Sequence, residues 1–309
     1  QKLPVGTAHT NTASIMAFGY NPFLTSWSPY HGAAYAVVES AAKVVAAGAR
    51  YDKMRYSYQE YFERMNSETS WGKPLAALLG ALKMQLALGL PSIGGKDSMS
   101  GTFQDINVPP MLMAFGITTV DARTVISPEF KAAGHKLYII RHTPLANYMP
   151  DTDALKRNFD FVSSAIEQGK IVAAYAVGFG GVVEAVAKMS FGNKVGAEVT
   201  MDEQALFNYA YGSFVVEATE ELTFDTAELI GQTEMVKYND EGKAAMKAKD
   251  YPTAIAAFSK VLEMDPTNGA TAIQLGQAYM RANQLDESIA ALEIAKANGQ
   301  EANAVKLIA

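Results

Sequence analysis

The sequence from residue 235 onward repeats itself at an interval of 34 residues. Four positions agree between the two copies: Gly242 with Gly276, Ala254 with Ser288, Phe258 with Leu292, and Val261 with Ala295. The same stretch is rich in Ala, Lys and Glu and has a helical periodicity of apolar residues throughout. A period of this length is typical of paired helices that bury their apolar faces against the next pair. Residues 231–309 are therefore predicted to form an all-α array of helical hairpins.

The repeat resembles the tetratricopeptide (TPR) family. Tyr238 and Pro266 complete the TPR pattern in the first copy, and Leu275 and Tyr279 complete it in the second. A third copy begins near Asn303 and runs to Ala309. About three repeats are usually needed for stability, so two repeats and a stub are expected to be marginal unless they dock on another structure. The resemblance implies a peptide ligand in the concave groove.

Residues 1–230 differ in character, because predicted helices alternate there with apolar strands. Small residues in Gly32–Ala47 form a broad apolar face and predict a helix that packs closely on a sheet and stops at Gly48. A second helix is predicted at Lys73–Leu88, with Pro74 in its first turn. Further helices are predicted at Asp151–Gln168 and Val182–Met189, a turn at Asn21-Pro22, and strands at Thr12–Phe18, Pro110–Val120, His135–Ile140, Ile171–Val177 and Tyr211–Ala218. The class is α+β, with an α+β half at 1–144 and an α/β half at 145–230.

Aromatic residues are concentrated in and just before the segment Met54–Met65. Charged residues are interleaved with them, which would suit the stacking of nucleic-acid bases. No basic patch surrounds the segment, so a core and lid segment is the better interpretation. The aromatic residues are Tyr51, Tyr56, Tyr58, Tyr61 and Phe62, and the charged ones are Arg55, Glu60 and Arg64.

Composition excludes several classes of function. The absence of cysteine excludes disulfides, thiolate metal sites and a glutaminase with a cysteine nucleophile. A net charge of −6 disfavours non-specific binding to nucleic acid or acidic membranes. No apolar run reaches the roughly 20 residues of a membrane span, and no export signal opens the chain, so a cytoplasmic location is expected.

The four histidines are scattered and have no paired metal-binding spacing, so zinc is not expected. His135 lies before an apolar strand and is interpreted as structural. His9 and His31 lie in polar segments and are candidates to face a ligand. No G-x-S-x-G sequence supports serine hydrolysis.

A glycine pair followed by charged and hydroxyl groups lies after the apolar run that ends at Leu90. The backbone N–H groups of Gly94 and Gly95 are predicted to turn around phosphate oxygens that Lys96 neutralises. Asp97 is a candidate metal ligand, and the hydroxyls of Ser98 and Ser100 are candidates to bind phosphate or sugar. The alternative is a polar turn between two strands.

This segment, Gly94–Phe103, closely resembles the GKDSMS-type motif of phosphoribosylformylglycinamidine synthase. The resemblance extends from about Leu3 to Leu222 and covers the second of that enzyme's two AIR-synthase-like domains. It implies ATP-dependent amidation in purine synthesis, which converts formylglycinamide ribotide to formylglycinamidine ribotide. ATP phosphorylates the formamide oxygen of the ribotide, and ammonia then displaces phosphate.

The resemblance also implies roles for individual residues and for partners. Lys96 would hold a phosphate, Asp97 a metal or the ribose, and Ser98 and Ser100 phosphate oxygens. The family site forms between two AIR-synthase-like domains, and its ammonia comes from a glutaminase domain. The first of those domains and the glutaminase are missing here, so we expect half of a site that needs them, or a like domain, as partner. No amidotransferase activity is expected from the chain alone.

Two further features bear on nucleotide binding. The glycines of Gly178-Phe179-Gly180-Gly181 join a predicted strand to a predicted helix, which is a suitable place for an anion or simply allows close packing. Glu39 has an ion-pair partner one helical turn on, Lys43. The resemblance instead places Glu39 where the family has a Mg-binding Glu in a Glu-x-x-x-Asn setting.

The chain departs from the family at the remaining positions of this metal site. Lys43 replaces an Asn, Thr7 an acidic ligand, and Ala176 and Gly178 an Asp and a Ser. With Glu39 as the remaining ligand, Mg²⁺ would be bound weakly or not at all, because it needs several oxygen ligands. Our hypothesis is that Lys43 substitutes for the metal charge, and that one of two pseudo-symmetric nucleotide sites has decayed to a structural role.

Two alternative interpretations remain open. In one, the chain is a TPR scaffold whose enzyme-like part is inert or regulatory. In the other, the join is artificial or mis-assembled, because no Pro- or Gly-rich linker separates Glu221 from Tyr238 and neither family normally carries the other.

Overall fold

The computed structural model describes residues 1–193, 195–234 and 236–308. These residues form two compact units. One consists of residues 1–129, 136–189 and 200–230, and the other of residues 130–135, 190–199 and 231–309. No helix in the described part of the chain is both long and apolar enough to cross a membrane.

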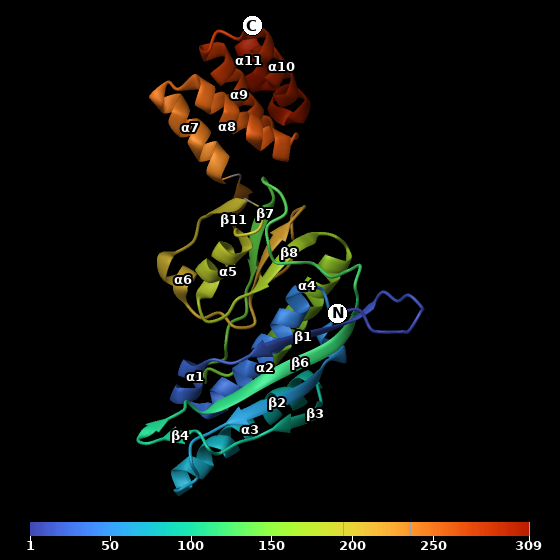
Figure 1. Cartoon of the computed structure of the whole chain (residues 1–309), viewed down its shortest axis with the longest axis vertical. Coiled ribbons are helices and arrows are strands. Elements are labelled where there is room, and N and C mark those ends of the chain that lie inside the picture. The colour runs from blue at the N-terminus through green and yellow to red at the C-terminus, as the bar shows by residue number, and fades with distance from the viewer. Residues whose placement is uncertain (194, 235, 309) are drawn as a thin grey trace. The chain divides into compact units, whose positions relative to one another are not determined.

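The first unit begins with a four-stranded sheet in the order β1-β6-β2-β3. Strand β6 pairs antiparallel with β1 and β2, and β3 lies parallel to β2 at the edge. Helices α2 and α3 pack on one face of this sheet (Figure 1). The elements are β1 (Thr12–Gly19), α2 (Pro29–Ala46), β2 (Arg55–Tyr61), α3 (Glu68–Leu88), β3 (Ser92–Lys96) and β6 (Met111–Asp121).

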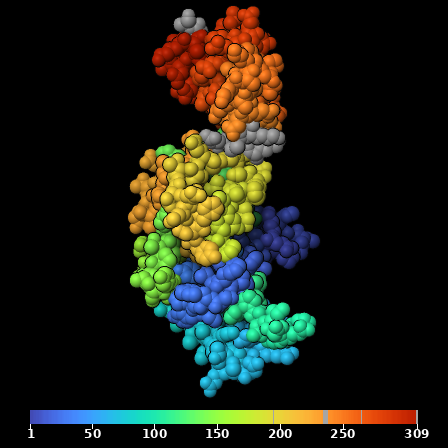
Figure 2. Space-filling view, turned by 90° about the vertical axis from the view of Figure 1, so that its left-hand side faces the viewer, coloured from blue at the N-terminus to red at the C-terminus, as the bar shows by residue number. Residues whose placement is uncertain are grey.

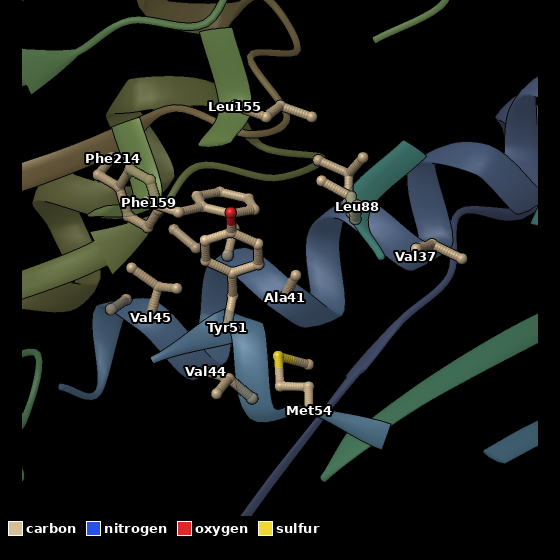
Figure 3. Packing of buried hydrophobic residues seen from close by; sticks show 14 of the residues in the cluster. Val37, Ala41, Val44, Val45, Tyr51, Met54, Leu88, Leu155, Phe159 and Phe214 are labelled. Atoms are coloured by element: carbon tan, nitrogen blue, oxygen red, sulfur yellow. The ribbon is translucent and has the colours of Figure 1, made fainter. Parts of the chain in front are cut away.

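Helix α2 is the centre of the core, as its run of small residues predicted. Nearly all of its residues from Gly32 to Ala46 are buried, which requires side chains that let neighbouring elements approach closely. Figure 3 shows Val44 and Val45 of α2 near Tyr51, with Phe159 and Phe214 contributed by a later helix and strand. One apolar core therefore joins the two halves of the first unit.

The second sheet has the order β8-β10-β7-β11-β9. Strand β7 belongs to it although it precedes residue 145, where we placed the boundary between the halves. The elements of this region are β7 (Lys136–Ile140), α4 (Thr152–Glu167), β8 (Ile171–Ala176), α5 (Gly181–Met189), β9 (Gly196–Val199), α6 (Glu203–Phe207), β10 (Phe214–Ala218) and β11 (Ala227–Glu234).

Local structure differs from prediction at two helix starts. Asn21-Pro22 is not a turn, because the Asn21 side chain accepts hydrogen bonds from the N–H groups of Phe23 and Leu24 and caps α1 (Pro22–Trp27). Helix α3 begins at Glu68 rather than Lys73, because Ser67 and Ser70 form a reciprocal cap. Pro74 therefore lies inside the helix and not in its first turn.

Strand β10, predicted as the last strand of the enzyme-like part, is followed by a further strand, β11. Strand β11 pairs with β9, and Gly231 lies opposite Val199. A Cβ atom on Gly231 would lie 1.9 Å from the carbonyl oxygen of Glu198. Neither β9 nor β11 was predicted from the sequence. The remaining short elements are η1 (Tyr51–Lys53), β4 (Thr102–Phe103) and β5 (Ile106–Asn107).

The C-terminal array of helical hairpins is confirmed from Val236 on, whereas residues 231–234, which were predicted to belong to it, lie in strand β11. Gly242 and Gly276 lie against the side chains of Phe258 and Leu292, so both copies of the repeat use the same contact. The helices are α7 (Val236–Ala248), α8 (Tyr251–Met264), α9 (Gly269–Arg281), α10 (Leu285–Ala295) and α11 (Glu301–Ile308), with a turn at Lys296–Gln300 before the last. Met235 and Ala309, the ends of the predicted repeat region, lie outside the described residues.

Candidate functional site

The glycine pair lies in a strand rather than in a turn. Gly95 pairs with Tyr58 and Lys96 with Gln59, whose Nε2 donates a hydrogen bond to the Lys96 carbonyl at 3.3 Å. Neither Gly94 nor Gly95 has a positive φ. A Cβ atom on Gly95 would lie 2.7 Å from the Tyr58 carbonyl oxygen. Close strand approach therefore accounts for Gly95, and the predicted phosphate-encircling turn is not formed here.

The residues after β3 hold their backbone against the end of β2. Ser98 N–H donates to the Glu60 carbonyl at 3.1 Å, and Phe62 N–H donates to the Ser98 carbonyl at 2.9 Å. The hydroxyls of Ser98 and Ser100 lie 2.9 Å apart. Beyond them the β4–β5 hairpin stands out from the surface of the first unit (Figure 2).

The two charged side chains of this segment, Lys96 and Asp97, are not paired within the described part of the chain. Lys96 Nζ and the Asp97 carboxylate make no hydrogen bond or ion pair with any described residue, and both residues are exposed. By strand register, Lys96 shares the open face of the sheet with Gln59. The backbone at Ser98 and Ser100 is thus held by hydrogen bonds, and a cation, a carboxylate and two hydroxyls from this segment lie where a ligand could reach them.

Glu60 also belongs to this site, although it was not among the predicted site residues. It is 6% exposed, and its Oε1 atom has no hydrogen-bond partner among the described residues. Burial, and secondarily the charge of Asp97, raises the pKa of Glu60 to about 7. The buried Tyr58 hydroxyl oxygen, two residues earlier, likewise has no hydrogen-bond partner in the described part of the chain. The signal was the alternation of Tyr56, Tyr58, Glu60 and Phe62, which places this carboxyl on the helix-covered face.

Glu39 is engaged by donors from its own chain. Its Oε1 lies 2.8 Å from Lys43 Nζ, and its Oε2 accepts a hydrogen bond from Tyr20 N–H at 3.0 Å. Lys43 Nζ also donates to the Phe18 carbonyl at 2.9 Å and lies 4.6 Å from the centre of the Phe18 ring. Burial raises the pKa of Glu39, against the opposing effect of Lys43.

The second glycine segment adjoins Glu39. A Cβ atom on Gly178 would lie 3.5 Å from Glu39 Oε1. Gly180 N–H donates to the Glu184 carboxylate at 2.8 Å, and Gly181 begins α5 with a φ of 71°. Glu184 in turn pairs with Lys188. The N-terminus of α5 is therefore capped by a carboxylate of its own first turn.

The predicted site residues fall into two groups. Glu39 lies with Gly178, Gly180 and Gly181 next to the end of β1, whereas Gly94–Ser100 lie on and after β3. Strands β1 and β3 form opposite edges of the sheet, so three strand spacings, about 14 Å, separate them. Among the described residues, no three His, Cys, Asp or Glu side chains gather as metal ligands.

Three of the four histidines, His31, His135 and His142, make hydrogen bonds within the described structure. His31 Nδ1 lies 2.8 Å from Ser28 Oγ, and its Nε2 lies 3.1 Å from the Asn147 carbonyl oxygen. His142 is buried; its Nε2 accepts a hydrogen bond from Asp151 N–H, so Nδ1–H donates to the Tyr211 carbonyl. Burial lowers the pKa of His142. His9 is exposed in the N-terminal segment, and His135 N–H donates to Thr233 Oγ1.

Comparison with protein families identifies two segments. Residues 129–249 match the C-terminal domain of AIR synthase related proteins. Residues 245–309 match the tetratricopeptide repeat. The second match covers the described helices α8 to α11 and confirms the repeat predicted from the sequence.

Curated relatives are PurL subunits of phosphoribosylformylglycinamidine synthase. The subunit of Picrophilus torridus is 27% identical over 230 residues, which are 65% of this chain and 30% of the relative. That of Sulfurimonas denitrificans is 24% identical over 271 residues, which are 77% of this chain and 36% of the relative. The chain thus spans about a third of the length of these relatives.

Solved structures share the fold at lower identity. PurL of Thermotoga maritima complexed with AMPPCP has a TM-score of 0.60 and 16% identity, over 73% of this chain and 41% of that chain. Thiamine monophosphate kinase of Aquifex aeolicus has a TM-score of 0.50 and 13% identity, over 72% of this chain and 85% of that chain. The chain is therefore similar to PurL over most of its length, with an AIR-synthase-related C-terminal domain at 129–249 and a tetratricopeptide segment at 245–309.

Proposed function

We propose that this chain supplies one wall of a composite phosphate-binding site of the PurL type, formed by Lys96, Asp97, Ser98 and Ser100. The observation that carries the proposal is that backbone hydrogen bonds hold Ser98 against the end of β2, while neither Lys96 Nζ nor the Asp97 carboxylate has a hydrogen-bond or ion-pair partner among the described residues. A ligand phosphate would supply the missing partner of the Lys96 ammonium. The glycine pair contributes by close strand packing rather than by encircling the phosphate.

The chemistry that this wall suits is ATP-dependent amidation. The γ-phosphoryl group would pass from ATP to the formamide oxygen of the ribotide, and ammonia would then displace that phosphate to leave an amidine. Such transfers depend on positioning and on neutralising charge. Lys96 would neutralise phosphate oxygens, and the two serine hydroxyls would donate hydrogen bonds to them. Asp97 fits Mg²⁺ only together with the phosphates, because Mg²⁺ is often held by one or two carboxylates plus substrate oxygens.

The second wall of the site would come from a like domain or from another synthase domain of the PurL type. The face of the first sheet that Lys96 shares is not covered by any described element and carries exposed apolar side chains at Met16, Phe18 and Ile117. An apolar face of this kind favours a protein partner. A glutaminase partner would supply ammonia, so we propose no amidation by this chain alone.

We infer that the Glu39 cluster has a structural role and binds Mg-nucleotide weakly or not at all. The Lys43 ammonium occupies one side of the Glu39 carboxylate, and the Glu184 carboxylate occupies the Gly180 N–H that a phosphate would use. The Lys43 ammonium thus takes the place of a metal cation, and the Glu184 carboxylate takes the place of a phosphate anion, at this edge of the sheet. Gly178, Gly180 and Gly181 would serve mainly close packing and helix capping.

Calorimetric titration of the full chain tests the phosphate site. ATP, ADP, inorganic phosphate and formylglycinamide ribotide are titrated with and without Mg²⁺. Lys96→Ala should weaken binding at least about tenfold, the equivalent of about 1.4 kcal/mol. Lys53→Ala, which removes another exposed lysine of the same unit, is the matched control and should change nothing. Equal binding by the Lys96→Ala variant would refute the assignment.

A second candidate function is peptide binding by the tetratricopeptide segment. A depression beside α7 and α8 combines the Tyr238 ring with the polar groups of Glu241 and Lys260. Titration with extended peptides followed by NMR shifts of these residues tests this function independently of nucleotide binding.

A further inference from the structure

Helix α3 has a second apolar face that nothing in the described chain covers. Six large side chains on it are about half exposed or more. They are Trp71 (59%), Leu75 (59%), Leu78 (47%), Leu79 (49%), Leu82 (48%) and Leu86 (74%). We propose that this face, called the α3 stripe below, binds the same stripe of a second copy of the chain as an antiparallel helix pair.

The stripe is continuous and separate from the buried face of the helix. At 100° per residue its six positions lie within a sector of about 100°. The residues that anchor α3 to its own unit are others, chiefly Ala77, Ala81 and Met84. The free face is therefore not needed to hold α3 in place. It also lies outside the residues of the proposed phosphate site.

The spacing of the stripe is symmetric about the Leu78–Leu79 bond. In an antiparallel pair with its two-fold axis there, Trp71 lies opposite Leu86, Leu75 opposite Leu82, and Leu78 opposite Leu79 of the other copy. Each large side chain of one copy then meets a large side chain of the other, as an isologous interface requires. This self-complementarity favours a second copy over an unrelated apolar partner.

The exposed area is sufficient for such a pair. Six side chains of this size and exposure present on the order of 600 Å² of apolar surface, at the upper end of the patches found on monomers. Two copies bury about 1,200 Å², which reaches the lower limit of stable protein interfaces. Charge does not oppose the pairing, because Lys73 is bound to Glu63 at 2.7 Å and Lys83 only flanks the stripe.

Cross-linking of the full chain tests the register, because the protein contains no cysteine of its own. Single cysteines are introduced as Leu78→Cys, Trp71→Cys and Leu86→Cys, and each is treated with a short bismaleimide. Leu78→Cys should give covalent dimers by itself, since it lies at the two-fold axis. Trp71→Cys and Leu86→Cys should each remain monomeric, because equivalent residues lie about 22 Å apart along the axis, and should cross-link when mixed.

Controls separate this pairing from other associations. Met16→Cys, on the open face of the first sheet, reports a dimer formed through that face instead. Sedimentation of a Leu78→Glu, Leu82→Glu variant should show the loss of the α3-dependent dimer, with an unchanged circular dichroism spectrum. Failure of Leu78→Cys to cross-link, or self-cross-linking of Trp71→Cys, would overturn the proposal.

Discussion

At the scale of single residues, the ion pair of Glu39 and Lys43 is the feature that most clearly distinguishes the Glu39 cluster from a magnesium site. Because Glu39 is 9% exposed and Lys43 provides its cation, the Lys43→Asn variant should leave a buried carboxylate uncompensated. The free energy of unfolding should fall by about 1–2 kcal/mol near neutral pH, less than for a fully buried pair because Lys43 is partly exposed. Urea titration measures this loss.

Lys260→Asn provides the control for this variant. Lys260 pairs with Glu263 on an exposed helix surface, and such pairs contribute little. A Lys43→Asn variant as stable as the Lys260→Asn variant would contradict the structural role of the pair.

Glu60 provides a pH-dependent test. Its folded pKa of about 7 lies above the usual 4.5, so its protonated form favours folding below pH 4.5 and that contribution is lost as the pH rises through about 7. The free energy of unfolding should therefore fall more in the parent chain than in Glu60→Gln between about pH 5 and pH 8, by about 1–3 kcal/mol. Parallel pH profiles from denaturant titration would contradict the raised pKa.

The sequence predicted some of these residues and missed others for a clear reason. The Glu39–Lys43 pair is local to one helix, so spacing alone predicted it. The Tyr20 N–H and the Phe18 carbonyl that complete its environment come from the end of β1 and were not predictable from helix spacing. Glu60 became interpretable only once its segment was known to be a strand.

At the scale of elements, the glycine pair of β3 allows a matched comparison. Gly95→Ala should destabilise the protein by about 1–3 kcal/mol, because its Cβ would lie 2.7 Å from the Tyr58 carbonyl oxygen. Gly94→Ala should have little effect, since nothing lies within 4 Å of its Cβ position. Thermal unfolding measures both. Equal effects, or a larger one for Gly94→Ala, would contradict the strand pairing.

The two hairpins of the tetratricopeptide segment give another element-scale prediction. Lys249 and Asn283, one repeat apart, both have positive φ values, 61° and 63°. Asn tolerates this conformation better than Lys, and Gly adopts it without strain. Lys249→Gly should raise the free energy of unfolding of this segment by about 0.5–1 kcal/mol, and Asn283→Gly by less. The opposite order in urea titrations of the full chain would contradict the turn geometry.

Elements were predictable where their signal was local. Helix α2 and the repeat helices were predicted from the periodicity of their apolar residues. Strands β9 and β11 were not, because they depend on pairing with each other and carry few large apolar residues. The start of α3 was misplaced because the reciprocal Ser67–Ser70 cap lies before the apolar pattern begins. The position of Gly94 and Gly95 in a strand parallel to β2 could not be predicted either, because β2 and β3 are separated in sequence by helix α3.

At the scale of the whole molecule, the chain combines a PurL-like part with a tetratricopeptide segment, and each was predictable from a different kind of signal. The repeat is recognisable from spacing, and the PurL-like part from one short motif. The roles of the predicted site residues could not be predicted from the sequence, because these residues form two groups that the sheet separates by about 14 Å. The fold is needed to distinguish the group at Lys96, whose charged side chains are exposed, from the group at Glu39, whose carboxylate is bound by Lys43 and the Tyr20 N–H.

Nucleotide binding by two variants of the full chain, compared side by side, tests this distinction most directly. ATP is titrated calorimetrically into Lys96→Ala and Glu39→Ala with and without Mg²⁺. We predict that Lys96→Ala loses at least about tenfold in affinity and that Glu39→Ala binds like the parent chain. Metal-dependent binding that survives Lys96→Ala and disappears in Glu39→Ala would contradict the account.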